Sequence, residues 1–312
     1  MRAPLALRTV VVTRDLEGPL DRAVRTILEA SWGKARSWIE AGKVRVAGTV
    51  ATEPTTRVRA GHEICIDEGA TRSRPTRLTE DQVVYVDSQV IVVAKPAGVS
   101  TVPFDDRETD TLEGRVRAWM ERKRLVPGKQ RPNLGVVHRL DKETSGLIVF
   151  TRTWLAKQSL AGQFRRHSVH RRYLAIVHGR VGARAYRSWL VDNRGDGLRG
   201  SVRGTPPTHA REAITHVEPL EALAQATLVA CRLETGRTHQ IRIHLSESGH
   251  PVVGDRVYTR RYSGSLIEAP RLMLHASELG FVHPATEQQV RWERAMPEDM
   301  AAVLDRLRHT PL

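Results

Sequence analysis

A dense polar segment followed at once by a strongly apolar one places the tightest constraint on how this chain folds. Residues 138–146 read HRLDKETSG, and residues 147–150 read LIVF. The apolar run predicts a buried strand, and Gly146 permits the backbone turn that leads into it. Asp141 then lies in a short turn with basic neighbours such as Arg139. Nearby positive charge favours the ionised form of a carboxylate, so we expect Asp141 to be charged.

Two interpretations of Asp141 fit this segment taken alone. As a structural residue, Asp141 caps the turn and pairs with Arg139. As a reactive residue, it presents an ionised carboxylate beside a core strand. An isolated Asp in such a turn is more often structural, so the remainder of the sequence has to decide between the two interpretations.

An excess of basic residues runs along the chain. Lys and Arg number 49 and Asp and Glu number 35, which gives a formal net charge of +14. Such an excess indicates an anionic partner, with nucleic acid as the first candidate, an anionic membrane surface as the second, and a merely solvated basic surface as the third. No apolar run approaches the roughly 20 residues that span a bilayer, and residues 1–12 lack a signal-peptide cleavage pattern. We therefore predict a cytoplasmic protein.

Motifs for the common cofactors are missing from the sequence. It contains neither a phosphate-binding Gly-x-x-x-x-Gly-Lys-Ser/Thr loop nor a dinucleotide fingerprint after a strand. His239, His244 and His250 invite a metal interpretation, but the first two are five residues apart and so do not share a helix face as an i, i+4 pair does. We expect no cofactor and no metal.

The first part of the chain has a compact order of predicted elements. Pro19 opens a helix, a second helix covers residues 34–41, and short strands follow within residues 44–50 and 57–66. The segment 39–48 and the order of these elements resemble the S4 RNA-binding domain. The candidate RNA-binding residues here are the basic ones on and after the second helix: Lys34, Arg36, Lys43 and Arg45.

The longer second part mixes predicted strands and helices. A Gly- and Arg-rich stretch, residues 192–208, is predicted to be a flexible basic loop that either touches RNA phosphates or is solvated. The strands are predicted at residues 83–86, 90–94, 147–150, 173–177, 213–217, 226–233, 272–276 and 279–281, and the helices at 111–124, 154–164 and 297–308.

Residues 138–146 are similar to the signature of the RluA-type RNA pseudouridine synthases. Further blocks of that family are similar to segments that occur here in the same order, and the resemblance covers about residues 80–284. Segment 99–106 departs from the family because it lacks the His-Pro of many members, and 192–208 aligns with no family segment. These departures concern which RNA is recognised. The further blocks are residues 83–98, 172–179, 234–245 and 249–255.

The resemblance implies that the protein converts a uridine in RNA into pseudouridine. The N1–C1′ bond breaks, the uracil turns over, and C5 bonds to C1′ without a cofactor. Asp141 is then the catalytic carboxylate, acting as a covalent nucleophile or through a glycal route. Arg242 is expected to pair with Asp141, and Tyr173 to pack beside the flipped base and to be available for proton transfer at the sugar.

The resemblance also implies RNA contacts around this centre. Arg139 is placed to fill the space that the flipped base leaves in the RNA stack. Arg237 and His239 either contact phosphate or brace their own motif, and the sequence does not separate these two roles.

The predicted organisation is an S4-like α/β domain at residues 1–67, a linker at 68–79, and an α+β catalytic domain at 80–312 with a mixed, largely antiparallel sheet. The predicted partner is ribosomal or transfer RNA, with no membrane, and the chain is expected to be a monomer. The alternatives are a non-catalytic RNA-binding or ribosome-assembly factor on the same fold and a metal-dependent nuclease.

Overall fold

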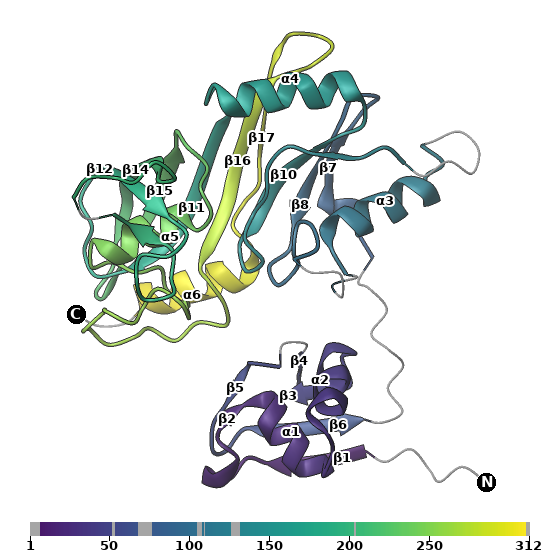
Figure 1. Cartoon of the computed structure of the whole chain (residues 1–312), viewed down its shortest axis with the longest axis vertical. Helices are drawn as coiled ribbons and strands as arrows, with labels where there is room; N and C mark the ends of the chain where they lie inside the picture. The colour runs from purple at the N-terminus through teal and green to yellow at the C-terminus, as the bar shows by residue number, and fades with distance from the viewer. Residues whose placement is uncertain are drawn as a thin grey trace. The chain divides into compact units, whose positions relative to one another are not determined.

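The chain divides into two compact units, Met1–Arg77 and Leu78–Leu312, as seen in a computed structural model (Figure 1). Leu78, at the end of the predicted linker, is buried in the second unit. Most of that linker, residues 68–76, lies outside the described residues. The structure describes residues 7–51, 54–67, 77–104, 108, 110–125, 132–202 and 204–309.

The N-terminal unit packs two helices on a small sheet. Pro19 precedes α1 (Leu20–Leu28), and the Ser31 side chain caps α2 (Trp32–Glu40) by accepting a hydrogen bond from the Lys34 amide. Leu20, Ile39 and other apolar side chains form its core. The sheet order is β1 (Leu7–Val11), β6 (Glu63–Asp67), β3 (Val44–Val46) and β4 (Thr49–Ala51), with a separate pair β2 (Gly18–Pro19) and β5 (Arg57–Val58).

The C-terminal unit is built on an eleven-stranded sheet within the described residues. Its strand pairs are antiparallel except for Ser145–Thr151 (β10) with Leu274–Val282 (β16), so the prediction of an α+β fold with a mixed, largely antiparallel sheet is confirmed. In order across the sheet, the strands are β13 (Gly200–Ser201), β12 (Arg184–Val191), β14 (Arg211–Ala222), β15 (Ala226–Leu233), β11 (His170–His178), β16 (Leu274–Val282), β10 (Ser145–Thr151), β8 (Val90–Lys95) and β7 (Val83–Val86), with β17 (Gln289–Glu293) on β16 and β9 (Gly135–Val136) on β10.

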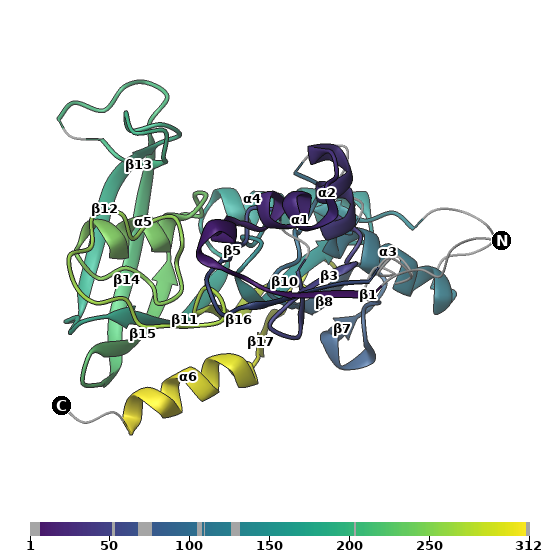
Figure 2. The ribbon, with the colours of Figure 1, turned by 90° about the horizontal axis from the view of Figure 1, so that it is seen from below.

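Helices cover both faces of this sheet. Side chains of β8 alternate, so Val90 and Val92 pack with α4 (Trp154–Arg165) while Ile91 and Val93 pack with α3 (Leu112–Arg122). Helix α5 (Gln240–Glu247) lies at the β12–β15 end of the sheet (Figures 1 and 2). Helix α6 (Glu298–Arg308) contributes apolar side chains to the main core.

A short parallel pairing, two residues long, between β10 and β16 joins the two halves of the sheet. Ser145 and Gly146 of β10 pair with His275 and Ala276 of β16. Gly146 has a φ of 117°, and a Cβ atom there would lie 2.2 Å from the carbonyl oxygen of Ala276. The backbones therefore approach so closely that only glycine fits, which is the physical reason for the last residue of the HRLDKETSG segment.

Some expectations from the sequence differ from the structure. The predicted pair of strands at 272–276 and 279–281 is the single strand β16. The stretch 192–208, predicted to be a flexible loop, includes β13 and a hydrogen-bonded turn. Strands β1, β12 and β17 were not predicted. None of the described helices has the length and apolar character needed to cross a bilayer.

Candidate active site

Asp141 lies in a turn whose backbone is stabilised by hydrogen bonds, two of them to a buried threonine. The amide of Thr144 donates to the Asp141 carbonyl at 3.1 Å, closing the turn. The Thr101 hydroxyl donates to the Leu140 carbonyl at 3.0 Å and accepts from the Leu140 amide at 3.1 Å. The carboxylate itself is 18% exposed. The turn therefore holds Asp141 in place while leaving its oxygens accessible.

Lys95, which the sequence interpretation did not assign to the site, is a main support of this turn. Its ammonium donates to the carbonyls of Pro96, Val99 and Lys142 at 3.0, 2.7 and 2.8 Å. The side chain is almost completely buried, and burial lowers the pKa of Lys95 to about 7, against the opposing charges of Glu143 and Asp141. Lys95 thus ties the end of β8 to the backbone just after Asp141.

Arg242 divides its guanidinium between two carboxylates. Its Nη1 donates to Asp141 Oδ2 at 3.3 Å, while Nε and Nη2 donate to Asp255 at 2.7 and 3.0 Å. Burial alone would lower the pKa of Arg242, but the hydrogen bonds and charge of Asp255 and the charge of Asp141 raise it. The guanidinium is therefore permanently charged and oriented toward Asp141.

Asp255 is the buried anchor of this arrangement and was not singled out from the sequence. Its Oδ1 also accepts the amides of Val257 and Tyr258 at 2.8 and 3.0 Å. Burial alone would raise the pKa of Asp255, but the hydrogen bonds and charge of Arg242 lower it. The signal that could have revealed Asp255 is its place in the 249–255 block that resembles the family.

Tyr173 reaches the same site from β11. It is 8% exposed, and among the described residues its hydroxyl makes no hydrogen bond, which leaves it available to a substrate. Burial raises the pKa of Tyr173, and the charge of Asp141 adds to this while Arg171 opposes it. The phenol is therefore protonated at neutral pH, as a proton donor has to be.

His239 stands beside Asp141 at the start of α5. Its Nε2 lies 3.8 Å from Asp141 Oδ2, and its Nδ1 is 2.9 Å from the hydroxyl of Tyr258. Its backbone is left-handed, with φ of 58°, so the ring is turned toward the site at some conformational cost. Burial lowers the pKa of His239, with Asp141 opposing, so the ring is largely neutral at pH 7.

Arg171 adds a buried cation that the sequence interpretation missed. Its Nη2 donates to the Glu234 carbonyl at 3.0 Å, and its guanidinium lies 5.5 Å from the centre of the Phe164 ring. Its Nε has no partner within the described part of the chain. Arg171 and Tyr173 are two residues apart on β11 and line the same cavity. The wall of that cavity is therefore positively charged near the phenol.

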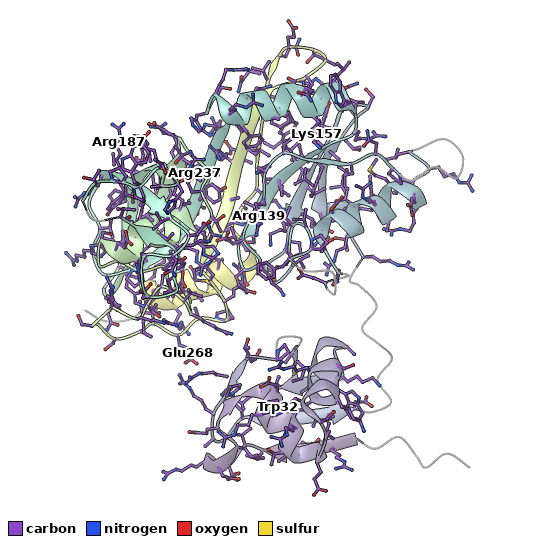
Figure 3. The ribbon with its side chains drawn as sticks, viewed as in Figure 1. Trp32, Arg139, Lys157, Arg187, Arg237 and Glu268 are labelled. Atoms are coloured by element: carbon purple, nitrogen blue, oxygen red, sulfur yellow. The ribbon has the colours of Figure 1, made fainter. Side chains whose placement is uncertain are left out.

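Asp141, Tyr173 and Arg242 line one cavity of about 340 Å³, whereas Lys95 and Asp255 support the site from outside its lining. This volume falls within the range of about 300–1,000 Å³ that is typical of small-molecule sites and suits a single nucleoside. Figure 3 marks Arg139 and Arg237, which lie beside it. The predicted residues that line the cavity are Arg139, Asp141, Tyr173, Arg237, His239 and Arg242.

Arg139 and Arg237 differ in how they are held. Arg139 is exposed at the edge of the cavity. Arg237 donates through Nε to the Glu212 carbonyl at 2.9 Å, and its amide donates to the Gln240 side chain at 3.0 Å. Arg237 is therefore tied to the backbone of β14 and to α5, while no such contact holds the Arg139 side chain within the described residues.

Three of the four predicted RNA-binding residues of the N-terminal unit lie near tryptophan rings. The ammonium groups of Lys34 and Lys43 lie 5.3 and 5.5 Å from the Trp38 ring centre. Arg36 pairs with Asp21 at 2.9 Å and lies 5.8 Å from the ring of Trp32, which Figure 3 marks.

Arg45 is exposed on β3. The basic residues that the S4 resemblance singled out are therefore on the surface or beside a partly exposed ring.

The three histidines considered for metal binding have separate partners. His244 bonds Ser188 and Thr215, each at 2.9 Å, and the Nδ1 of His250 lies 3.0 Å from the His178 carbonyl. Within the described residues, no group of three His, Cys, Asp or Glu side chains is arranged to hold a metal ion.

The sheet supports a cavity lined by a carboxylate, a phenol and arginines, and comparison with known proteins identifies the family in which this arrangement occurs. A family model described as RNA pseudouridylate synthase matches residues 89–247, and an S4 domain model matches residues 19–64. The chain belongs to the RNA pseudouridylate synthase family, whose members isomerise uridine in RNA to pseudouridine. The predicted family, enzyme class and S4 domain are confirmed.

Individual relatives agree with this assignment. Ribosomal large subunit pseudouridine synthase D of Nitrosomonas europaea is 34% identical over 94% of this chain and 85% of its own length. The protein of the same name from Zymomonas mobilis is 34% identical over 93% of this chain and 94% of its own length. The solved structure of human RNA pseudouridylate synthase domain containing 4 shares the fold, with a TM-score of 0.59 and 24% identity over 72% of this chain and 92% of that one.

Proposed function

We propose that this enzyme isomerises a uridine of large-subunit ribosomal RNA and that Asp141 is its catalytic carboxylate. The substrate assignment is supported by the names of the relatives from Nitrosomonas europaea and Zymomonas mobilis. The role of Asp141 is supported by one observation above all: its accessible carboxylate shares a cavity with Tyr173 and is oriented by Arg242. Transfer RNA is the alternative substrate.

Access to the cavity requires the target base to leave the RNA stack. Unstacking costs a few kcal/mol, and a side chain that takes the place of the base recovers part of that cost. Arg139 is two residues before Asp141 and exposed at the cavity edge, so its guanidinium is suited to this replacement. Lys34 and Lys43 on the S4 domain supply further contacts to the RNA backbone.

The reaction then needs a negatively charged group close to C1′ and the movement of one proton. The ionised oxygen of Asp141 attacks C1′ or stabilises the positive charge that develops there as the N1–C1′ bond breaks. After the uracil has turned over, the C5–C1′ bond forms, C5 loses its proton, and N1 carries one. Tyr173, protonated and without a partner, is placed to assist this proton movement, and Arg242 keeps Asp141 oriented throughout.

All of these side chains come from one chain, so the reaction requires no second copy and we propose a monomer. We propose the cytoplasm as the location of the reaction, on the basis of the proposed ribosomal RNA substrate.

The experiment compares wild type with Asp141→Asn on unmodified large-subunit ribosomal RNA and on unmodified transfer RNA. Pseudouridine is detected by carbodiimide treatment and primer extension, and RNA binding is measured in parallel. We expect modification of the ribosomal RNA by wild type, loss of modification in the variant, and retention of binding. The control is Asp110→Asn, which changes a partly exposed carboxylate paired with Arg115 and should modify normally.

Two results would contradict the proposal. Modification of transfer RNA alone would overturn the substrate assignment, and full activity of Asp141→Asn would overturn the catalytic role. If wild type binds RNA tightly but modifies neither substrate, the non-catalytic binding factor becomes the better description.

A further inference from the structure

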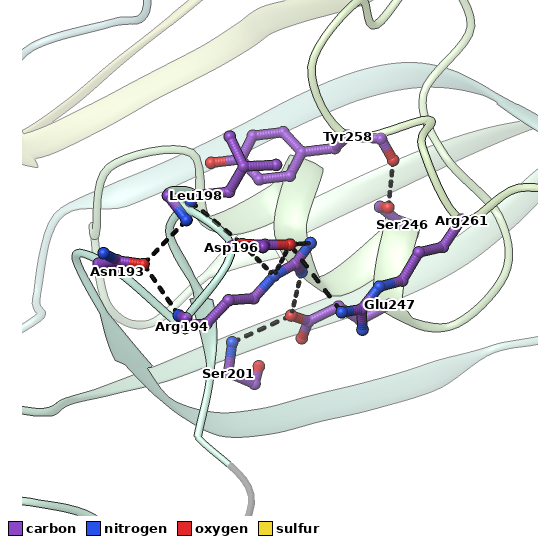
Figure 4. A network of polar contacts seen from close by, with 11 residues as sticks. Asn193, Arg194, Asp196, Leu198, Ser201, Ser246, Glu247, Tyr258 and Arg261 are labelled. Atoms are coloured by element: carbon purple, nitrogen blue, oxygen red, sulfur yellow. Dashed lines mark hydrogen bonds and ion pairs between the residues drawn. The ribbon is translucent and has the colours of Figure 1, made fainter.

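The segment between β12 and β13 is a compact turn with most of its polar groups satisfied internally. The Asn193 side chain accepts the amides of Gly195 and Gly197 at 2.8 and 3.0 Å. The Leu198 amide donates to Asp196 at 3.1 Å, and the Arg194 amide donates to the Leu198 carbonyl at 2.8 Å (Figure 4). These bonds give the segment, here called the 192–201 turn, one defined shape.

The 192–201 turn is attached to α5 at two points by a single carboxylate. Glu247 accepts a hydrogen bond from Nη1 of Arg194 at 3.0 Å and from the amide of Ser201 at 3.0 Å. Arg194 also binds Asp196 at 2.9 Å, so its charge is fully neutralised. A Cβ atom at Gly200 would lie 2.2 Å from Arg194 Cδ, which shows how closely the turn is packed.

This attachment brings the turn beside the active site. Leu198 packs on a cluster that contains Ile243 of α5 and Tyr258. The ring of Tyr258 lies 5.0 Å from the guanidinium of Arg242, and its hydroxyl bonds His239. Tyr258 therefore links Leu198 to Arg242 and His239, whose side chains contact Asp141. Arg199 follows Leu198 directly in the chain.

Arg199 is a partly exposed cation of the 192–201 turn. Its side chain is 40% exposed, and its ion-pair partner, Asp192, is 83% exposed. An ion pair this exposed contributes little to stability, typically about 0–1 kcal/mol, so another anion can replace Asp192 readily. The positive charge of Arg199 also reaches the site: burial lowers the pKa of His239, and Arg199 adds to that lowering.

We propose that Arg199 binds a backbone phosphate of the RNA strand that carries the target uridine, and that Asp192 occupies its guanidinium when RNA is absent. The inference rests on the proposed function, isomerisation of a uridine in RNA, and adds a substrate contact outside the cavity. A phosphate is the expected ligand because it is present beside every target base and because a guanidinium binds its oxygens in a two-pronged geometry. The docked turn presents Arg199 with little ordering left to occur on binding.

The test uses the two members of one ion pair, because the proposal assigns them opposite effects. Arg199→Ala should weaken RNA binding and raise KM several-fold while kcat at saturating RNA is kept. Its plot of log Kd against log salt should lose about one unit of slope, so that binding falls about three-fold less than in wild type between 50 and 200 mM salt. Asp192→Asn should bind RNA at least as tightly as wild type, with the same slope.

A structural role for the pair predicts something different, since both variants break the same contact. Equal weakening by Arg199→Ala and Asp192→Asn would overturn the inference, as would an unchanged salt slope in Arg199→Ala. The control is Arg308→Ala on α6, whose side chain is 44% exposed and also pairs with carboxylates. A loss of slope in this control equal to that in Arg199→Ala would likewise overturn it.

Wild-type activity separates this inference from the proposed function. An inactive wild type contradicts the proposed function, whereas an active wild type with no effect in Arg199→Ala contradicts only the inference. Thermal unfolding of each variant checks that the fold is kept.

Discussion

Arg242 and Asp255 form a two-pronged ion pair beneath the active site, with contacts of 2.7 and 3.0 Å, while the contact from Arg242 to Asp141 is 3.3 Å. The two carboxylates differ in burial: the Asp255 side chain has no exposed surface, and that of Asp141 is 18% exposed. Asp255 therefore fixes the arginine, and the fixed arginine orients the exposed carboxylate.

Replacement of Asp255 by Asn should damage both stability and activity. The buried guanidinium of Arg242 loses its main counter-charge, and breaking a buried pair in this way costs about 3 kcal/mol of unfolding free energy. Urea denaturation measures this loss. Asp141→Asn is the matched comparison, since it keeps the pair with Asp255 and should unfold close to wild type while lacking activity. Equal stability of the two variants would show that Asp255 is not the anchor.

Replacement of Lys95 by Met should change how stability depends on pH. The pKa of Lys95 is about 7 in the folded protein and about 10.5 unfolded, so between these values the unfolded chain binds more protons. The effect of Lys95 on the free energy of unfolding therefore becomes more favourable as pH rises across this window and less favourable as pH falls toward 7. The difference in unfolding free energy, wild type minus Lys95→Met, should increase from pH 7 to pH 10. A flat difference would contradict the low pKa.

Replacement of Gly146 by Ala should prevent normal folding of the C-terminal unit. The new methyl group meets the Ala276 backbone at 2.2 Å, and φ is 117°. Gly98→Ala is the control, because φ is 79° there but no atom lies within 4 Å. The free energy of unfolding of Gly98→Ala should fall only by the cost of the left-handed backbone conformation, about 1–2 kcal/mol. Thermal unfolding compares them, and similar losses in both would refute the close-approach explanation.

Replacement of Tyr173 by Phe should separate chemistry from packing. The ring still fills its place on β11, and the lost hydroxyl has no hydrogen bond among the described residues, so the melting temperature should stay within a few degrees of wild type. If the hydroxyl assists proton transfer, single-turnover isomerisation should slow by about 10²–10⁴-fold with RNA affinity kept. A rate equal to that of wild type would limit Tyr173 to packing.

The active-site residues that were predicted from the sequence all lie in short segments that resemble the family. Asp141, Tyr173 and Arg242 lie in three such segments, and the structure brings all three to one cavity. Elements with a clear period of two or 3.6 residues, such as β8 and α3, were also predicted close to their observed bounds. In both cases the information lies within a window of a few residues.

What was missed depends on contacts between distant residues. Lys95 meets the Lys142 carbonyl 47 positions away, so its role has no local pattern. Strand β12 is half exposed and was not visible as an apolar run. Strand β17 did offer a usable signal, because Val290 and Trp292 alternate with exposed residues. The place of β16 in the middle of the sheet follows only from long-range pairing.

That central place of β16 has a consequence for biosynthesis. The strand begins at Leu274, yet it lies between β10, which follows Asp141, and β11, which carries Tyr173. A nascent polypeptide that has emerged only as far as residue 270 already contains every proposed catalytic side chain, but it lacks the strand that joins their supports. We therefore expect the enzyme to gain activity late in its own translation, when β16 inserts and closes the sheet.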